Sequence, residues 1–347
     1  MNARTSATVE ELIDGLPVVS EHDYHWITNE QRHGKWQAGK LHWIPVGRNR
    51  GNGGNIKLAG EPFNPIAERV VNGMEALIEL HRLLELQENP ASPEPLSPRA
   101  AVERYFGLPK LDDIERMSEP NRSQLRSLVS EVQKKLKLLL DYDPASSEFA
   151  VTIRDLGMGQ SPSRMKSTLL SLTQSDKPDK KYLIGLFGQG GSSAYHASNY
   201  SIILSRRAPQ LREADGDDRI GWTIVRQMFQ EGRRDTYWAY LATSEDGSLP
   251  SLSAEAADGA NFDQGSQFCH IGYGFGGAKS AVSRQFYQAM NHLLFSPILP
   301  YELYAMKDKP DAMRGTAQRL ALKVRDGDAS KKSSLSKSFP QLNVTLA

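Results

Sequence analysis

Apolar residues recur every three to four positions in several stretches of the chain, and this spacing predicts helices. The longest stretch covers about 65–86 and begins at Pro65, a residue that suits the first turn of a helix. The next two cover about 98–106 and 121–141. In the second of these, one face carries Leu125, Leu128, Val129, Val132, Leu136 and Leu139. Further helices are predicted at 161–172 and 281–294.

Short apolar or alternating runs, separated by turn residues, predict β-strands. These runs cover 40–46, 149–153, 200–205, 220–226, 236–243 and 267–273. Their alternation fits antiparallel strands with one open face, and the predicted helices are interleaved with them along the chain. We therefore predict an α+β fold rather than a doubly wound parallel sheet. Prolines at 90, 93, 95 and 98 predict an exposed loop between the first two helices.

Composition limits the class of protein. With 347 residues, 39% of them hydrophobic, the chain has enough apolar material for one large domain or two smaller ones. The net charge of +1 gives no overall basic field of the kind that attracts nucleic acid. The single cysteine, Cys269, excludes an internal disulfide and fits a reducing compartment. We find no apolar run of membrane-spanning length and no signal peptide, so we expect a cytoplasmic protein.

The predicted helix at 65–86 carries a narrow polar stripe. On a helical wheel, Asn72, Glu75 and Glu79 fall within about 40° of Glu68. One interpretation is the solvated face of an amphipathic helix. The other assigns chemistry to the spacing, because a carboxylate at Glu68 can deprotonate a water and an amide oxygen one turn later, at Asn72, can bind Mg²⁺.

Two glycine-containing strings follow this helix in the sequence. In the first, a predicted strand ends in Asp155, followed by Gly157 and Gly159, which fits either an Asx-type turn or a backbone that approaches a ligand closely. The second precedes a predicted short helix and contains Gly188, Gln189, Gly190, Gly191, Ser192 and Ser193. Such a string forms either a flexible loop or a cradle of backbone N–H groups for phosphate.

In this order, the three motifs resemble the ATP site of the GHKL superfamily, which includes gyrase B, heat-shock 90 chaperones, histidine kinases and MutL. Residues 68–76 resemble the E-x-x-x-N-x-x-D-A box, with Glu75 in place of the usual Asp. The two glycine strings resemble the first and second glycine boxes, and Gly265-Ser266 resembles the late G-T strand, with Ser in place of Thr. The resemblance covers about 60–275 and is closest to bacterial proteins of the heat-shock 90/MutL-like branch, some of which occur among antiviral defence genes.

The resemblance implies a Bergerat-type sandwich, a mostly antiparallel sheet covered by helices on one face. It implies that Asp155 binds the adenine amino group, that Asn72 holds Mg²⁺ and that Glu68 activates the attacking water. Gly188 to Ser193 would hold the phosphates of ATP, Gly157 and Gly159 would allow close approach, and Ser266 would join the adenine-binding water network. Slow ATP hydrolysis would be coupled to closure of the lid, the segment that ends at the second glycine string, and ATP would promote formation of a homodimer. A protein or a nucleic acid is a possible partner. The alternative is a nucleotide-gated binding module, such as a DNA clamp or chaperone-like part, with little hydrolysis.

The same resemblance suggests a domain plan. Residues 1–60 would form an N-terminal arm with a basic loop, and 61–298 would form the ATPase domain with an insert near 87–145. Residues 299–347 would be a C-terminal extension, at the position where the family's transducer domain starts. The end of this extension is rich in Ser, Lys and Asp, which predicts disorder.

A rival nucleotide motif lies further along the chain. Gly272 to Gly277 satisfies G-x-G-x-x-G between a predicted strand and a predicted helix. The acidic partner expected about 20 residues later is missing, and Ala278 before Lys279 breaks the P-loop pattern. A structural turn is therefore favoured. Cys269 and His270 are adjacent in a predicted strand, so their side chains are expected on opposite faces and not as a catalytic pair.

Overall fold

The computed structural model describes residues 42–49, 51–52, 61–110, 113–114, 117–171, 180–184, 190–212, 216–229, 236–252, 262–276 and 279–315. The predictions for the first 41 residues, for Gly188 and Gln189 and for the tail after residue 315 lie outside this part of the chain.

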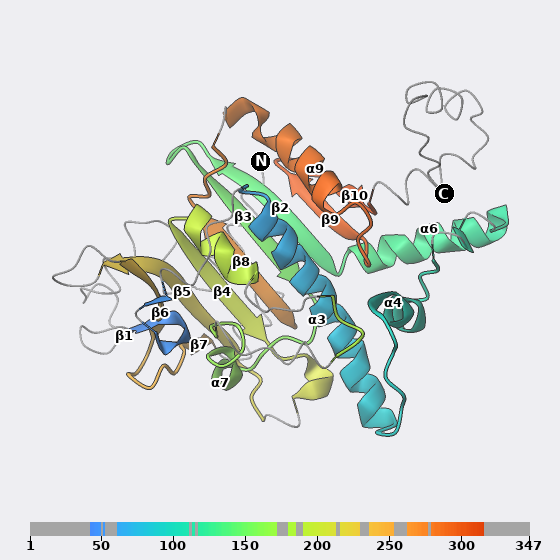
Figure 1. Cartoon of the computed structure of the whole chain (residues 1–347), viewed down its shortest axis with the longest axis horizontal. Helices are drawn as coiled ribbons and strands as arrows, with labels where there is room; N and C mark the ends of the chain where they lie inside the picture. The colour runs from blue at the N-terminus through green and yellow to red at the C-terminus, as the bar shows by residue number, and fades with distance from the viewer. Residues whose placement is uncertain are drawn as a thin grey trace.

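One mixed sheet forms the centre of the structure (Figure 1). Its strands are β1 (His42–Pro45), β2 (Leu136–Asp143), β3 (Glu148–Asp155), β4 (Tyr200–Arg206), β5 (Ile220–Phe229), β6 (Thr236–Ala242), β7 (Ser251–Leu252), β8 (Gly265–Ile271), β9 (Tyr301–Ala305) and β10 (Asp311–Met313). The order is β1-β6-β5-β4-β8-β3-β2-β9-β10, with β7 paired to β5. The described pairs are antiparallel except β2 with β9, which is parallel. The predicted α+β class is confirmed.

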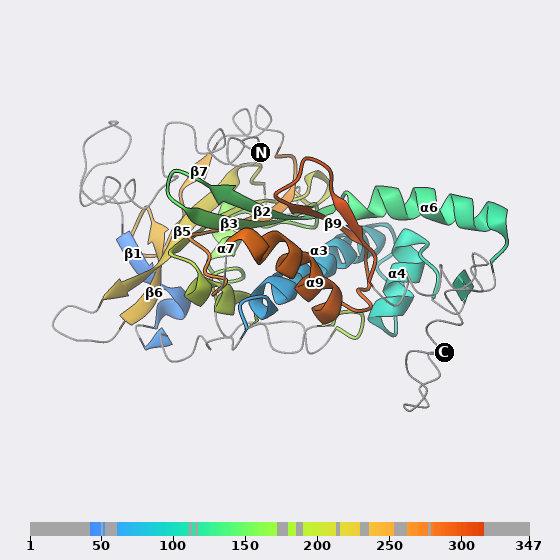
Figure 2. The same cartoon turned by 90° about the horizontal axis from the view of Figure 1, so that it is seen from above.

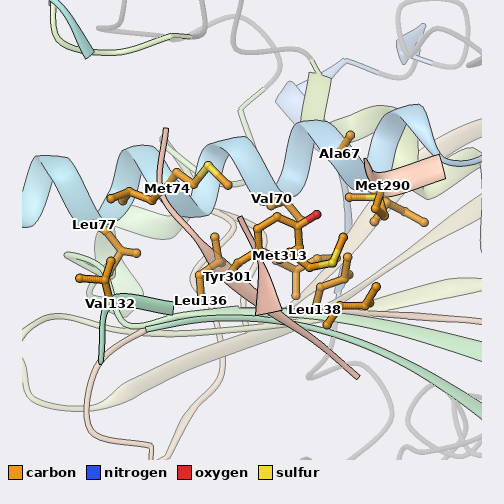
Figure 3. Close-up of a cluster of buried hydrophobic side chains, with 14 of the residues drawn as sticks. Ala67, Val70, Met74, Leu77, Val132, Leu136, Leu138, Met290, Tyr301 and Met313 are labelled. Atoms are coloured by element: carbon orange, nitrogen blue, oxygen red, sulfur yellow. The ribbon is translucent and has the colours of Figure 1, made fainter. Parts of the chain in front are cut away.

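Helices α3 and α9 cover one face of this sheet (Figure 2). The helical elements are α3 (Asn64–Glu88), α4 (Pro98–Phe106), α6 (Glu119–Gln133), α7 (Pro162–Met165), the 3-10 helix η4 (Gly190–Ala197) and α9 (Val282–Leu293). The largest core lies between α3, α9 and the strands β2, β3 and β9. Figure 3 shows Val70 and Met74 of α3 above Leu136 and Leu138 of β2. Burial of the apolar side of α3 thus leaves the opposite, polar side of this helix for other contacts.

The helix predicted over 121–141 is wrong in its second half. Helix α6 ends at Gln133, and β2 begins at Leu136 and pairs with all of β3. Leu136, Leu138 and Leu140 alternate along β2 and are fully buried. The run of leucines satisfies a helical and a strand period equally well, so pairing with β3 decides between them. The helix predicted at 161–172 is also too long, since α7 ends at Met165.

The sheet continues through two regions that the domain plan treated as additions. Strand β2 lies within the predicted insert at 87–145, yet it pairs with β3 and β9. Strands β9 and β10 lie within the predicted C-terminal extension, and β9 extends the same sheet, with Lys137 opposite Glu302. Strands β9 and β10 therefore belong to the same sheet as β3.

Candidate functional site

The first glycine string packs directly against α3. The backbone N–H of Met158 donates to the Ala76 carbonyl at 3.2 Å, and a Cβ added at Gly157 would lie 2.6 Å from the Ala76 backbone. A Cβ added at Gly73 would lie 3.5 Å from Cβ of Asp155. Small residues on both sides therefore bring the end of β3 beside the helix that carries Glu68 and Asn72.

The Asp155 side chain is buried at this junction, with 4% of its surface exposed. Its Oδ1 accepts a hydrogen bond from the backbone N–H of Gly157 at 2.9 Å, which is the Asx-type turn, and the backbone N–H of Ser266 also donates to the carboxyl group. Burial nevertheless raises the pKa of Asp155 to about 7, because desolvation outweighs these bonds. A buried carboxyl group with a fixed orientation can accept a hydrogen bond from one donor of a ligand and disfavours a ligand that lacks this donor.

Two serines follow on the next strands of the sheet, Ser266 on β8, which pairs with β3, and Ser205 on β4, which pairs with β8. Ser266 is opposite Asp155 in the register of β8 and β3, and its Oγ lies 2.9 Å from Oγ of Ser205 on β4. Ser205 also donates to the Gly265 carbonyl and accepts the backbone N–H of Gln160 at 2.8 Å. The sequence motifs did not indicate Ser205, because its nearness to the site comes from strand pairing alone.

Gly159 is held in a conformation that excludes a side chain. Its φ is +57°, and a Cβ there would lie 1.8 Å from the Arg206 carbonyl oxygen. Backbone crosses backbone at this position, so no side-chain movement can relieve the contact. The glycine therefore has a structural reason to be present besides any ligand.

We expect Gly159→Ala to destabilise the fold by several kcal/mol, through the left-handed φ and the clash with Arg206 together. Gly216→Ala is the matched control, since Gly216 has a φ of +63° with nothing within 4 Å of its added Cβ. The control should lose only the conformational part, about 1 kcal/mol. Urea unfolding measures both, and equal losses in the two variants would contradict the close backbone crossing.

Glu68 lies at the N-terminal end of the polar stripe and meets the second glycine string. The Ser193 hydroxyl, on η4, donates a hydrogen bond to the Glu68 carboxylate. Partial burial raises the pKa of Glu68, while Ser193 and the charge of Arg69 oppose this shift. Asn72 is half-buried one turn further along α3. The structure thus brings Glu68 and Ser193 together; Gly190, Gly191 and Ser192 lie in the same 3-10 helix.

Arg69 of α3 contacts η4, and the sequence motifs did not indicate this role. It is buried, its guanidinium lies 4.0 Å from the ring centre of Phe268, and it donates to the Tyr195 hydroxyl at 3.2 Å. Burial, with a further contribution from Arg69, lowers the pKa of His270 to about 3, so this ring is neutral. A buried cation is thus held by an aromatic face and a hydroxyl on the element that carries Ser193.

The other half of the polar stripe binds residues 180–184 and is not a solvated face. The backbone N–H of Ile184 donates to Glu75 at 2.7 Å. Glu79 accepts from the Lys180 ammonium at 2.5 Å and from the Tyr182 hydroxyl at 3.0 Å. The two carboxylates therefore hold the chain just before the second glycine string. Lys180 is thus paired with Glu79 on α3.

The described part of the rival glycine motif, Gly272 to Gly276, is a loop whose aromatic side chains enter the core. Tyr273 and Phe275 are buried, and the Tyr273 hydroxyl donates to the Pro62 carbonyl at 2.6 Å. Cys269 is buried on the opposite side of β8 from His270, and burial raises the pKa of its thiol to about 11. These residues have packing roles in the described structure.

No family model matches the chain, and no curated protein sequence matches it either. Among the residues that the structure describes, we find no helix with both the length and the apolar character needed to cross a bilayer.

Proposed function

We propose that this protein is a Mg²⁺-dependent ATPase of the GHKL type, built on a Bergerat-type sandwich. One observation carries the proposal: a single helix, α3, sets the spacing between a buried carboxyl group and an accessible one. Asp155 lies beside Gly73, and Glu68 precedes Gly73 by five residues (73 − 68), which is about 7.5 Å along a helix. Such a spacing suits a ligand that is bound at one end and cleaved at the other.

The buried end fits adenine. The Asp155 carboxylate would accept a hydrogen bond from the exocyclic amino group, and Gly157 and Gly159 would keep the backbone close. Ser266, opposite Asp155 in the sheet and within hydrogen-bond distance of Ser205, would join the contacts to adenine. Guanine presents a carbonyl oxygen at the corresponding position and would leave the carboxylate facing another acceptor. Preference for ATP over GTP follows from this arrangement.

The accessible end fits the phosphates. Backbone N–H groups of Gly190 to Ser193 would face phosphate oxygens, and the side-chain oxygen of Asn72 would contribute one ligand to Mg²⁺. When bound, Mg²⁺ supplies charge neutralisation at the phosphate oxygens. Ser193 of this string contacts the polar stripe through Glu68.

Glu68 would act as the general base. Its carboxylate accepts a proton from the attacking water as the new bond from oxygen to the γ-phosphorus forms, and ADP leaves with the electron pair of the broken P–O bond. A raised pKa suits this role, because a base with a pKa nearer to neutrality accepts a proton more readily. We extend the proposal to nucleotide-dependent formation of a homodimer, which size-exclusion chromatography with and without ATP would test.

The direct test is phosphate release from ATP by the purified protein, with Mg²⁺ or with EDTA and with GTP as the comparison substrate. We expect slow hydrolysis that requires Mg²⁺ and prefers ATP. Binding of ATP without turnover would favour a nucleotide-gated binding module instead, and absence of both binding and turnover would remove the proposal.

Tyr195→Phe tests the support that Arg69 gives to the glycine string. The variant removes one hydrogen bond to a buried guanidinium, worth about 1 kcal/mol, and should raise the KM for ATP about 5-fold. Tyr105→Phe is the control, since its hydroxyl bonds to Glu85 near the other end of α3. A KM that changes equally in the two variants would exclude a positioning role for Tyr195.

A further inference from the structure

A second site lies away from the glycine strings, where α4, α6 and the end of β10 meet (Figure 1). It is a cavity of about 30 Å³, partly open to solvent. Leu108, Val129, Pro297 and Pro300 contribute to its apolar walls. By volume it holds about two waters or one carboxylate-sized group.

Two arginines line this cavity, Arg99 from the first turn of α4 and Arg314 just after β10. Arg99 makes one long hydrogen bond, 3.4 Å, to the Ile298 carbonyl. Nε of Arg314 is buried and has no hydrogen-bond partner among the described residues. Burial lowers the pKa of both groups, and the nearby charge of Arg126 lowers that of Arg314 further. The cavity therefore concentrates positive charge.

Two buried arginines elsewhere in the described structure have carboxylate partners. Arg206 is 2% exposed, pairs with Asp218 at 3.0 Å and donates to the Phe262 carbonyl at 3.1 Å. Arg82 pairs with Glu85 at 2.7 Å. Arg99 and Arg314 are half-buried and have no such carboxylate among the described residues, and partial desolvation of a cation without a counter-charge costs stability. A bound anion would supply the missing charge and stabilise the folded state.

We propose that the cavity binds a carboxylate that carries an apolar substituent. A carboxylate has the planar, two-oxygen geometry that guanidinium groups recognise, and one such group fits the volume. Because the cavity is partly open to solvent, the apolar substituent would extend outwards from the carboxylate along the apolar lining, which includes Leu108 and the two prolines. A small organic acid and the C-terminus of a peptide present the same chemistry.

Thermal unfolding at low ionic strength tests this site. We expect N-acetyl-leucine to raise the Tm of the full chain, and N-acetyl-leucinamide, which lacks the charge, to leave it unchanged. Arg314→Met should abolish the shift. Because it removes a cation that has no carboxylate partner among the described residues, it should also raise the Tm of the ligand-free protein by about 2–4 °C. Arg284→Met, at an exposed position of α9, is the control and should change neither.

A lower Tm for ligand-free Arg314→Met would show that Arg314 stabilises the fold and would overturn the proposal. Equal shifts with the acid and the amide, or a shift retained in Arg314→Met, would do the same. Inorganic phosphate is the third ligand, and a shift with phosphate but not with N-acetyl-leucine would contradict the assignment to a carboxylate. A hexapeptide with a free or an amidated C-terminal leucine distinguishes a small organic acid from a peptide C-terminus as the source of the carboxylate. If only the free form binds, both sources are supported. If neither form binds, only the small acid is supported.

Discussion

Glu68→Gln is expected to lower the kcat for ATP hydrolysis at least about 100-fold while the affinity for ATP changes little. Glutamine keeps the size of the side chain and an oxygen that accepts the Ser193 hydrogen bond, so η4 should stay in place on α3. It cannot accept the proton of the attacking water. Single-turnover hydrolysis measures the loss, and titration with a fluorescent nucleotide measures the binding.

Glu88→Gln is the matched control, because Glu88 is an exposed carboxylate at the far end of the same helix. This variant should hydrolyse ATP at the wild-type rate. Undiminished hydrolysis in Glu68→Gln would show that another group takes the proton. Loss of nucleotide binding together with hydrolysis would assign Glu68 a role in holding the ligand instead.

Asp155→Asn is expected to weaken ATP binding by about 100-fold. The amide oxygen of the variant can still accept the N–H of Gly157, but its NH₂ group would then face the amino group of adenine, so two donors would meet in a buried site. Loss of a charged hydrogen bond with an unsatisfied donor costs about 3 kcal/mol, which corresponds to that factor. Asp141→Asn is the control, since burial also raises the pKa of Asp141, to about 6, on the adjacent strand β2. Equal affinities in the two variants would refute adenine binding by Asp155.

The same variant has a separate effect on stability. The pKa of Asp155 is about 7 in the folded protein and 3.8 as the reference for the unfolded chain. Between these values the folded state holds a proton that the unfolded state has lost, so the free energy of unfolding falls as pH rises from about 4 to 7. The upper limit is roughly 4 kcal/mol, at 1.36 kcal/mol per pH unit. The free energy of unfolding of Asp155→Asn, relative to that of the wild type, should therefore be higher at pH 8 than at pH 4.5. Urea unfolding at the two pH values measures this difference. A difference independent of pH would contradict the raised pKa.

Elements with a strong local period were predicted from the sequence. Helix α3 follows from its apolar face and from Pro65 in its first turn, and β3 follows from a β-branched run that ends at Asp155. The polar stripe of α3 was also identified, since a helix places residues one turn apart on the same side. These predictions depend on residues close together in the chain, whose spacing alone determines the face on which they lie.

Several contacts between distant segments were not predicted. Strand β2 replaced the end of a predicted helix because pairing with β3 and β9 outweighs the helical period of its leucines. Glu75 and Glu79 belong to a polar stripe whose sequence pattern is equally typical of a solvent-exposed helix face. Their contacts with residues 180–184 depend on how the folded chain packs and could not be predicted from this pattern. Arg69 and Ser205 carry no motif, so their place in the site follows from the packing of α3 and the register of β4 with β8.

By itself, the sequence determined which residues can do chemistry: a carboxylate and an amide one turn apart, and glycines where backbone must come close. The tertiary structure decided which of them meet. In the folded structure Asp155 is buried beside α3 and its pKa is raised, and Ser193 donates a hydrogen bond to Glu68. Arg99 and Arg314 have no counter-charge among the described residues. Desolvation and long-range pairing cause these differences, and both depend on which surfaces the folded chain brings together.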